Sequence, residues 1–106
     1  MQRICFLLQV RSDKLPEYRK AHENVWPEML SALRKHGWHN YSLFLTEEGL
    51  LIGYVETPDF AKAVAGMQDE EVNTRWQAAM KEYFVPLKTG AADTSLKLVE
   101  QVFYLA

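Results

Sequence analysis

The sequence predicts an α+β fold in which helices cover one face of a four-stranded antiparallel sheet. Three observations support this class. Apolar segments near both ends of the chain have the character of strands, two alternating segments in the middle are joined by a short turn, and helical segments lie between them. The 106 residues are enough for about one domain, so we expect a single domain over residues 1–106.

The first two elements are a strand and a helix. Ile4–Val10 is apolar on both alternating faces, which predicts a strand buried on both sides. Ser12–Asp13 can cap the helix that follows, and Pro16 is compatible with its first turn. We expect this helix to extend to about His36, because Gly37 offers a left-handed stop.

Pro27 lies inside that helical segment and leaves two interpretations open. A proline cannot donate a hydrogen bond to the carbonyl four residues back, here that of Glu23, so a continuous helix would be kinked. In the second interpretation, one helix ends near Asn24 and another begins at Pro27, because proline is permitted in a first turn. The sequence favours neither.

The rest of the chain predicts a hairpin, further helices and a final strand. His39–Thr46 alternates like a strand, and Glu47–Gly49 is a tight connection to a second strand at Leu50–Glu56, which predicts a hairpin. The resulting order, β-α-β-β-α-β, is the ferredoxin-like pattern. The remaining expected segments are helices at about 60–67 and 70–83, a loop at 85–94 and a strand at Leu96–Leu105.

The first and last strands predict a second subunit. Helices cover only one face of a ferredoxin-like sheet, yet apolar residues occupy both faces of these strands, for example Ile4 and Phe6 on one side and Cys5 and Leu7 on the other. A large uncovered apolar surface is unusual for a monomer. We therefore expect a homodimer that buries the second face.

Charge and hydropathy exclude several classes of protein. The formal net charge is −2 and both signs are spread along the chain, so there is no basic stripe and nucleic acid is not an expected partner. No apolar run reaches the ~20 residues of a membrane span, and nothing resembles a secretory signal. The single cysteine, Cys5, is interpreted as a small buried hydrophobic residue. We expect a cytoplasmic protein with no membrane partner.

Three residues of the first helical segment form the sharpest chemical pattern. Tyr18, His22 and Trp26 are spaced at i, i+4 and i+8, which puts them on one face of a continuous helix. A phenol, an imidazole and an indole together can exchange protons and stack on a sugar ring. Spacing alone, however, favours a buried core stripe whose histidine is merely hydrogen-bonded.

Other candidate residues are ambiguous on pattern alone. Trp76 has the spacing of a core-facing helical residue, and Tyr41 alternates with Leu43 along a strand. The three histidines and Cys5 lack the spacing of metal ligands, and there is no glycine-rich phosphate loop, GxSxG or CxxC. We therefore expect neither a metal nor another cofactor.

Three motifs carry a resemblance to a known family. Residues 17–28 (EYRKAHENVWPE) resemble the EYxxxH…(I/V)WPE signature of L-rhamnose mutarotases. Residues 36–42 (HGWHNYS) are similar to that family's HGxHNYS segment, and residues 101–105 (QVFYL) to its (E)VFYL ending. The first motif is specific, because six residues of unusual types agree in order, and the resemblance extends over essentially the whole chain.

The resemblance implies a dimeric α/β barrel that interconverts the α and β anomers of L-rhamnose or a related 6-deoxy sugar without a cofactor. His22 matches the family's proton donor, and Tyr18, Tyr41 and Trp76 match its sugar-contacting positions. We include Trp26 among the substrate-binding residues as a stacking surface. On this basis the core-stripe interpretation of His22 and its neighbours is replaced by a functional one.

Two departures from the family pattern concern the sugar more than the reaction. Gln77 stands where the family usually has a second tryptophan, and we expect it to contact the substrate. Residues 91–95 (AADTS) stand where the family often carries an Asp-Asn-Ser-Pro stretch. The alternatives to a mutarotase are an oxygenase on the same dimeric α/β barrel, which added haem would reveal by a Soret band, and a non-enzymatic sugar-binding dimer, which would tolerate loss of His22.

Overall fold

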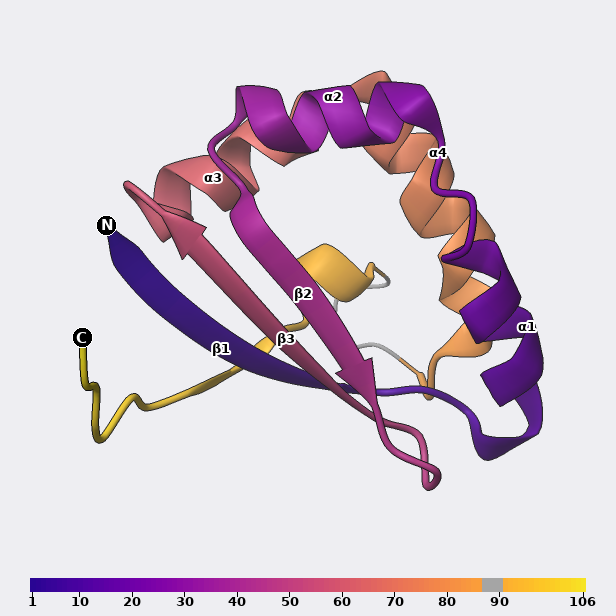
Figure 1. Ribbon diagram of the computed structural model, residues 1–106. Helices are drawn as coiled ribbons and strands as arrows, with labels where there is room; N and C mark the ends of the chain where they lie inside the picture. The colour runs from indigo at the N-terminus through magenta and orange to yellow at the C-terminus, as the bar shows by residue number, and fades with distance from the viewer. Residues whose placement is uncertain (87–90) are drawn as a thin grey trace.

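A computed structural model describes residues 1–86 and 91–106, and it confirms the α+β class. The strands form one antiparallel sheet in the order β2-β3-β1-β4 (Figure 1). No helix in these two ranges is long and apolar enough to cross a membrane. The strands are β1 (Gln2–Gln9), β2 (His39–Leu45), β3 (Leu50–Thr57) and β4 (Lys97–Val99).

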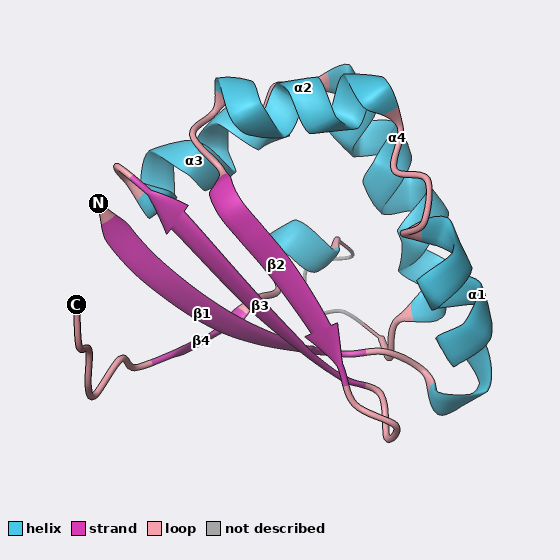
Figure 2. Ribbon diagram, viewed as in Figure 1, coloured by secondary structure: helices cyan, strands magenta, loops and turns pink. Residues whose placement is uncertain are grey.

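The helices form an arch over one face of this sheet (Figure 2). They are α1 (Leu15–Ala21), α2 (Pro27–Lys35), α3 (Phe60–Gln68) and α4 (Glu71–Met80), with 3₁₀ turns at Ser12–Lys14, Lys81–Tyr83 and Ala92–Thr94. The core lies between the arch and the sheet. Phe6, Leu51 and Val55 reach it from the strands, and Met67 and Met80 reach it from the helices.

The predicted hairpin of β2 and β3 is confirmed, and two of its glycines allow the first segment of the chain to approach it closely. Gly49 has a φ of +94°, and a Cβ there would lie only 2.4 Å from the carbonyl oxygen of Val10. Gly53 on β3 is opposite Phe6 on β1, and a Cβ would lie 2.1 Å from the Phe6 ring. Glycine at position 53 therefore lets the phenyl ring lie flat across the inner face of the sheet.

The single helix predicted up to about His36 is wrong, and the two-helix interpretation of Pro27 is correct. The residue before a proline is pushed out of the helical region, and Trp26 accordingly has φ −55° and ψ 134°. Tyr18 lies in α1, His22 is the C-terminal cap of α1, and Trp26 is the N-terminal cap of α2. The three side chains therefore do not form a stripe on one helix.

The predicted start of this helical region is wrong, and its predicted end is confirmed. The structure gives α1 no side-chain cap, because its N-cap is Lys14, so the expected cap at Ser12–Asp13 is wrong. Asp13 instead forms an ion pair with Arg11 at 2.8 Å. The expected stop is confirmed, because Gly37 follows the end of α2 with a φ of +81°.

The last strand is much shorter than predicted. Only Lys97–Val99 pairs with β1, instead of the whole of Leu96–Leu105, and residues 100–106 have no regular structure and extend away from the helices (Figure 2). Alternation of apolar residues gives a strand only where a neighbouring strand supplies hydrogen bonds, and the pairing with β1 ends at Val99. The predicted loop at 85–94 contains a 3₁₀ turn at Ala92–Thr94, and its residues 87–90 lie outside the described ranges.

Candidate functional site

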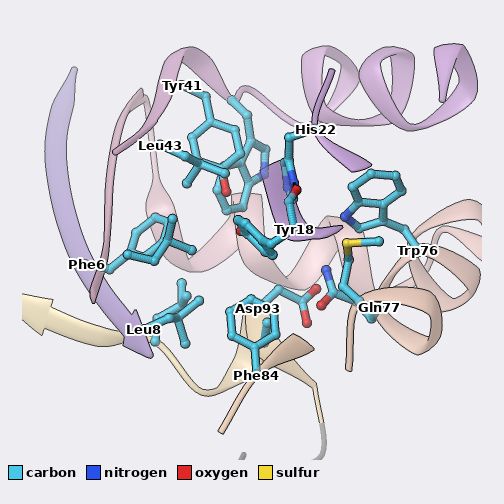
Figure 3. Close-up of a pocket in the computed structure, with 15 residues that line it drawn as sticks. Phe6, Leu8, Tyr18, His22, Tyr41, Leu43, Trp76, Gln77, Phe84 and Asp93 are labelled. Carbon is cyan, nitrogen blue, oxygen red and sulfur yellow. Dashed lines mark hydrogen bonds between the residues drawn. The ribbon is translucent and has the colours of Figure 1, made fainter. Parts of the chain in front are cut away.

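Two adjoining cavities open between the inner face of the sheet and helices α1, α2 and α4, and Figure 3 shows the side chains that line the smaller one. The larger measures about 350 Å³, within the ~300–1,000 Å³ of small-molecule sites. Its walls are aromatic and apolar with a few polar side chains, which suits an amphipathic ligand such as a sugar. The residues lining both cavities are His22, Trp38, Tyr41, Leu43, Trp76, Gln77 and Asp93.

The ring of His22 is held through one nitrogen, and its other nitrogen has no hydrogen-bond partner within residues 1–86 and 91–106. Its Nδ1 lies 2.9 Å from the backbone carbonyl oxygen of Tyr18. A carbonyl only accepts, so Nδ1 carries the hydrogen and Nε2 has the lone pair in the neutral ring. Burial lowers the pKa of His22, and the hydrogen bond to the Tyr18 carbonyl opposes this only partly. At neutral pH the free nitrogen is therefore a proton acceptor.

Two tyrosine hydroxyls complete the acid–base inventory of the cavity. Tyr18 is buried, with its ring centroid 4.3 Å from that of His22. Burial raises the pKa of Tyr18, and interaction with Tyr41 raises it further. Tyr41 is 36% exposed as a whole residue, and burial followed by the charge of Asp93 raises its pKa. Both phenols therefore stay protonated and can donate.

Trp76 forms an apolar wall, and Trp26 supports it from outside the cavities. Trp76 lies on α4 with its ring edge-to-face on His22, at a centroid distance of 5.5 Å. Trp26 packs edge-to-face on Trp76 at 5.0 Å and is not among the residues that line either cavity. Five of the predicted site residues therefore line one cavity: Tyr18, His22, Tyr41, Trp76 and Gln77. The sixth, Trp26, packs against Trp76 on the side away from the cavity lining.

Sequence reasoning missed two polar residues at this site. Asn73 on α4 is 3% exposed, and its side chain connects Gln77 to Asp93. Asp93 lines both cavities and comes from the 91–95 segment that departs from the family pattern. That departure was the only signal, because a carboxylate in a segment without periodicity cannot be assigned to a cavity from sequence.

His36 and His39 line neither cavity, and of the two only His39 is exposed. His36 lies against Gly66, and its Nε2 is 2.7 Å from a carboxylate oxygen of Glu70. Within residues 1–86 and 91–106, no group of three or more His, Cys, Asp or Glu side chains could hold a metal ion.

Comparison with known proteins gives a consistent result over the whole chain. Residues 3–105 match the family model described as L-rhamnose mutarotase. The chain is 41% identical over 108 residues to an L-rhamnose mutarotase of Bacillus subtilis and 37% identical over 107 residues to one of Oceanobacillus iheyensis, with 99% of each chain covered in both cases. In fold it is similar to a crystal structure of an L-rhamnose mutarotase from Formosa agariphila, with a TM-score of 0.84, 20% identity and full coverage of both chains.

Proposed function

The chain belongs to the L-rhamnose mutarotase family, and from this premise we propose that it is an isomerase that interconverts the α and β anomers of L-rhamnose. A related 6-deoxy sugar is the same class of substrate. The observation that carries the chemistry is His22, whose Nε2 is a free base in a cavity that also holds two protonated phenols.

Ring opening requires two proton transfers. His22 Nε2 accepts the proton of the anomeric hydroxyl while the bond between the anomeric carbon and the ring oxygen breaks, and the ring oxygen takes a proton from a phenol, that of Tyr18 or Tyr41. The anomeric oxygen becomes the aldehyde carbonyl. Rotation about the C1–C2 bond turns this carbonyl over, and closure reverses both transfers. His22 therefore accepts in one half of the cycle and donates in the other.

The remaining site residues hold the sugar. Trp76 offers its apolar surface to the ring carbons and methyl group, and Gln77 offers an amide beside it. Trp26 acts on the substrate through Trp76, because its ring packs against that indole. Mutarotation also occurs unaided in water, so the ~10²–10⁴-fold of positioned acid–base catalysis is a sufficient scale.

The assembly that we propose is a homodimer of ferredoxin-like subunits, each one domain over residues 1–106, whose two sheets form a dimeric α/β barrel. The strand order β2-β3-β1-β4 and the placement of helices on one sheet face support it. Exposed apolar residues near the C-terminus support it further. These are Leu98, Val99, Val102, Phe103, Tyr104 and Leu105.

Saturation-transfer NMR tests the reaction directly, because it measures anomer exchange at equilibrium. The wild-type protein should accelerate exchange of L-rhamnose, and His22→Ala should lose about 10²–10⁴-fold of that acceleration while remaining folded by circular dichroism. Tyr18→Phe and Tyr41→Phe form the matched pair, and the one that loses as much as His22→Ala carries the second proton. Exchange no faster than in buffer would refute the proposed function.

A further inference from the structure

A hydrogen-bonded chain of side chains fixes the carboxylate of Asp93 at the wall of the cavity. Its Oδ2 accepts from Asn73 Nδ2 at 2.7 Å and from Gln68 Nε2 at 2.9 Å. Asn73 Nδ2 also donates to the carbonyl oxygen of Met67 at 3.0 Å. Because one carboxylate oxygen is held by two donors, the direction of the other, Oδ1, is fixed as well.

The same chain of contacts fixes the amide of Gln77. Asn73 uses its nitrogen on two acceptors, so its oxygen is the atom that faces Gln77. Gln77 must then present its nitrogen, and Nε2 does lie 3.2 Å from Asn73 Oδ1. The opposite orientation of the Gln77 amide would bring two oxygens together. Gln77 Oε1 is therefore directed away from Asn73.

Two acceptor atoms in this wall have no donor. Asp93 Oδ1 and Gln77 Oε1 are both buried, and neither accepts a hydrogen bond from the part of the chain that the structure describes. Buried acceptors are paired in most native proteins, because leaving one without a partner costs about 1–3 kcal/mol and more for a charged group. Both residues line the two cavities that His22 lines, and Figure 3 shows Asp93 beside Gln77.

We propose that Asp93 is a substrate-binding residue whose Oδ1, together with Gln77 Oε1, accepts hydrogen bonds from two hydroxyl groups of the sugar. This inference rests on the proposed function. A carboxylate oxygen and an amide oxygen only accept, so the wall selects donors. His22 engages the hydroxyl at C1, which leaves those at C2, C3 and C4 for this wall. Sugar phosphates and uronates, which present acceptors with negative charge, are excluded by the same chemistry.

Asp93→Asn is the decisive substitution, because it keeps the shape and inverts the polarity of one atom. The two donors on Oδ2 hold the amide oxygen in that place, so an NH₂ group replaces Oδ1. We expect the KM for L-rhamnose to rise about 10- to 100-fold with kcat within a few-fold of wild type, since a contact made equally in ground and transition states affects binding alone. The matched control is Asp69→Asn, the same change of charge at an exposed carboxylate that lines neither cavity, and it should change KM by less than about 3-fold.

The 2-, 3- and 4-deoxy analogues of L-rhamnose separate substrate binding from a structural effect. The KM penalty of Asp93→Asn should largely disappear on the one analogue that lacks the hydroxyl bound by Asp93. An unchanged KM, or a penalty that is the same for L-rhamnose and all three analogues, would overturn the proposal. Calorimetric titration of L-rhamnose into wild type and Asp93→Asn gives the same comparison without catalysis. A wild type that binds L-rhamnose but does not accelerate exchange would refute the proposed reaction. The assignment of Asp93 would then be decided by the titrations alone.

Discussion

The chemistry of His22 depends on the hydrogen bond at its other ring nitrogen. The carbonyl of Tyr18 is available because His22 caps α1, where carbonyls have lost their helical partners. The same end of the helix places the imidazole against Trp76, and burial there keeps it neutral. One local feature, the early end of α1, therefore fixes the tautomer, the orientation and the protonation state of the base.

The pH dependence of kcat/KM should report this base. Burial lowers the pKa of His22 below its usual value of 6.5, so the ring loses its proton at a lower pH and is neutral at pH 7. Activity should stay constant through neutral pH and fall only as the pH drops below about 6.5. The raised pKa values of Tyr18 and Tyr41 predict no alkaline limb below about pH 10.

Anomer exchange measured by NMR, corrected for catalysis by buffer and hydroxide at each pH, gives this profile. Activity that instead decreased as the pH rose through 6.5 would require an imidazolium as the acid and would contradict the assignment of Nε2 as a base.

Gln77 should determine how sharply the enzyme discriminates between sugars. A tryptophan at this position would replace the free amide acceptor by an apolar wall suited to the 6-methyl group of L-rhamnose. Gln77→Trp should therefore shift the ratio of kcat/KM for L-rhamnose over L-mannose, which has a hydroxymethyl group instead, towards L-rhamnose by about 10-fold, a typical effect for one pocket contact. Gln77→Ala, which removes the amide without adding an apolar wall, is the control. An unchanged ratio would place Gln77 outside the site.

Which site residues could be predicted depended on their local structure. Tyr18 and His22 could be recognised because they lie within one continuous motif, and both line the smaller of the two cavities. Trp26 could not be placed, because its position depends on where α1 ends and α2 begins. Asp93 could not be predicted at all, because its role comes from a contact with Asn73, which lies 20 residues away in sequence.

At the scale of elements, strands were predictable where alternation coincides with burial. Along β3 every second residue from Leu51 to Thr57 is buried, as expected of a strand with one face in the core. The division at Pro27 was not predictable, because a kinked helix and two helices obey the same local rule. The length of the final strand was overestimated. Apolar residues do alternate along the C-terminal segment, but β1 pairs only with Lys97–Val99.

Gly53 shows how one element shapes the cavity, and its replacement should disturb both stability and binding. A Cβ at Gly53 would lie 2.1 Å from the Phe6 ring, so Gly53→Ala forces the ring to move into the cavity that it lines. Overpacking of this kind costs about 1–3 kcal/mol of unfolding free energy. Urea denaturation should show this loss, and the KM for L-rhamnose should rise in the protein that remains folded. The double variant Gly53→Ala with Phe6→Leu should recover part of the stability, because a smaller side chain relieves the clash. A Gly53→Ala variant as stable as wild type would contradict this account.

At the scale of the molecule, the apolar C-terminal segment is the feature that a single subunit leaves unexplained. Six large hydrophobic residues between Leu98 and Leu105 are at least 42% exposed, and contiguous apolar exposure of this kind marks an interaction surface. Within its own chain, Leu98 and Val99 are held by pairing with β1, and Tyr104 lies against the guanidinium of Arg3, which is 3.7 Å from the ring centroid. The outer sheet face beside it is also uncovered, so two copies related by a twofold axis could bury both surfaces at once.

The last prediction is therefore that the protein is a dimer whose formation depends on this segment. Light scattering during size-exclusion chromatography should give twice the 12.3 kDa of one chain at micromolar concentration. Phe103→Asp places a charge in the centre of the proposed interface, where desolvation opposes association, and should shift the equilibrium to monomer. The midpoint of thermal unfolding should then be lower than that of the wild type and should lose the dependence on protein concentration that a dimer shows. Gln101→Ala, in the same exposed segment, is the control and should remain a dimer. A wild type that elutes as a monodisperse monomer would refute the homodimer, and a Phe103→Asp variant as dimeric as wild type would move the interface away from the C-terminal segment.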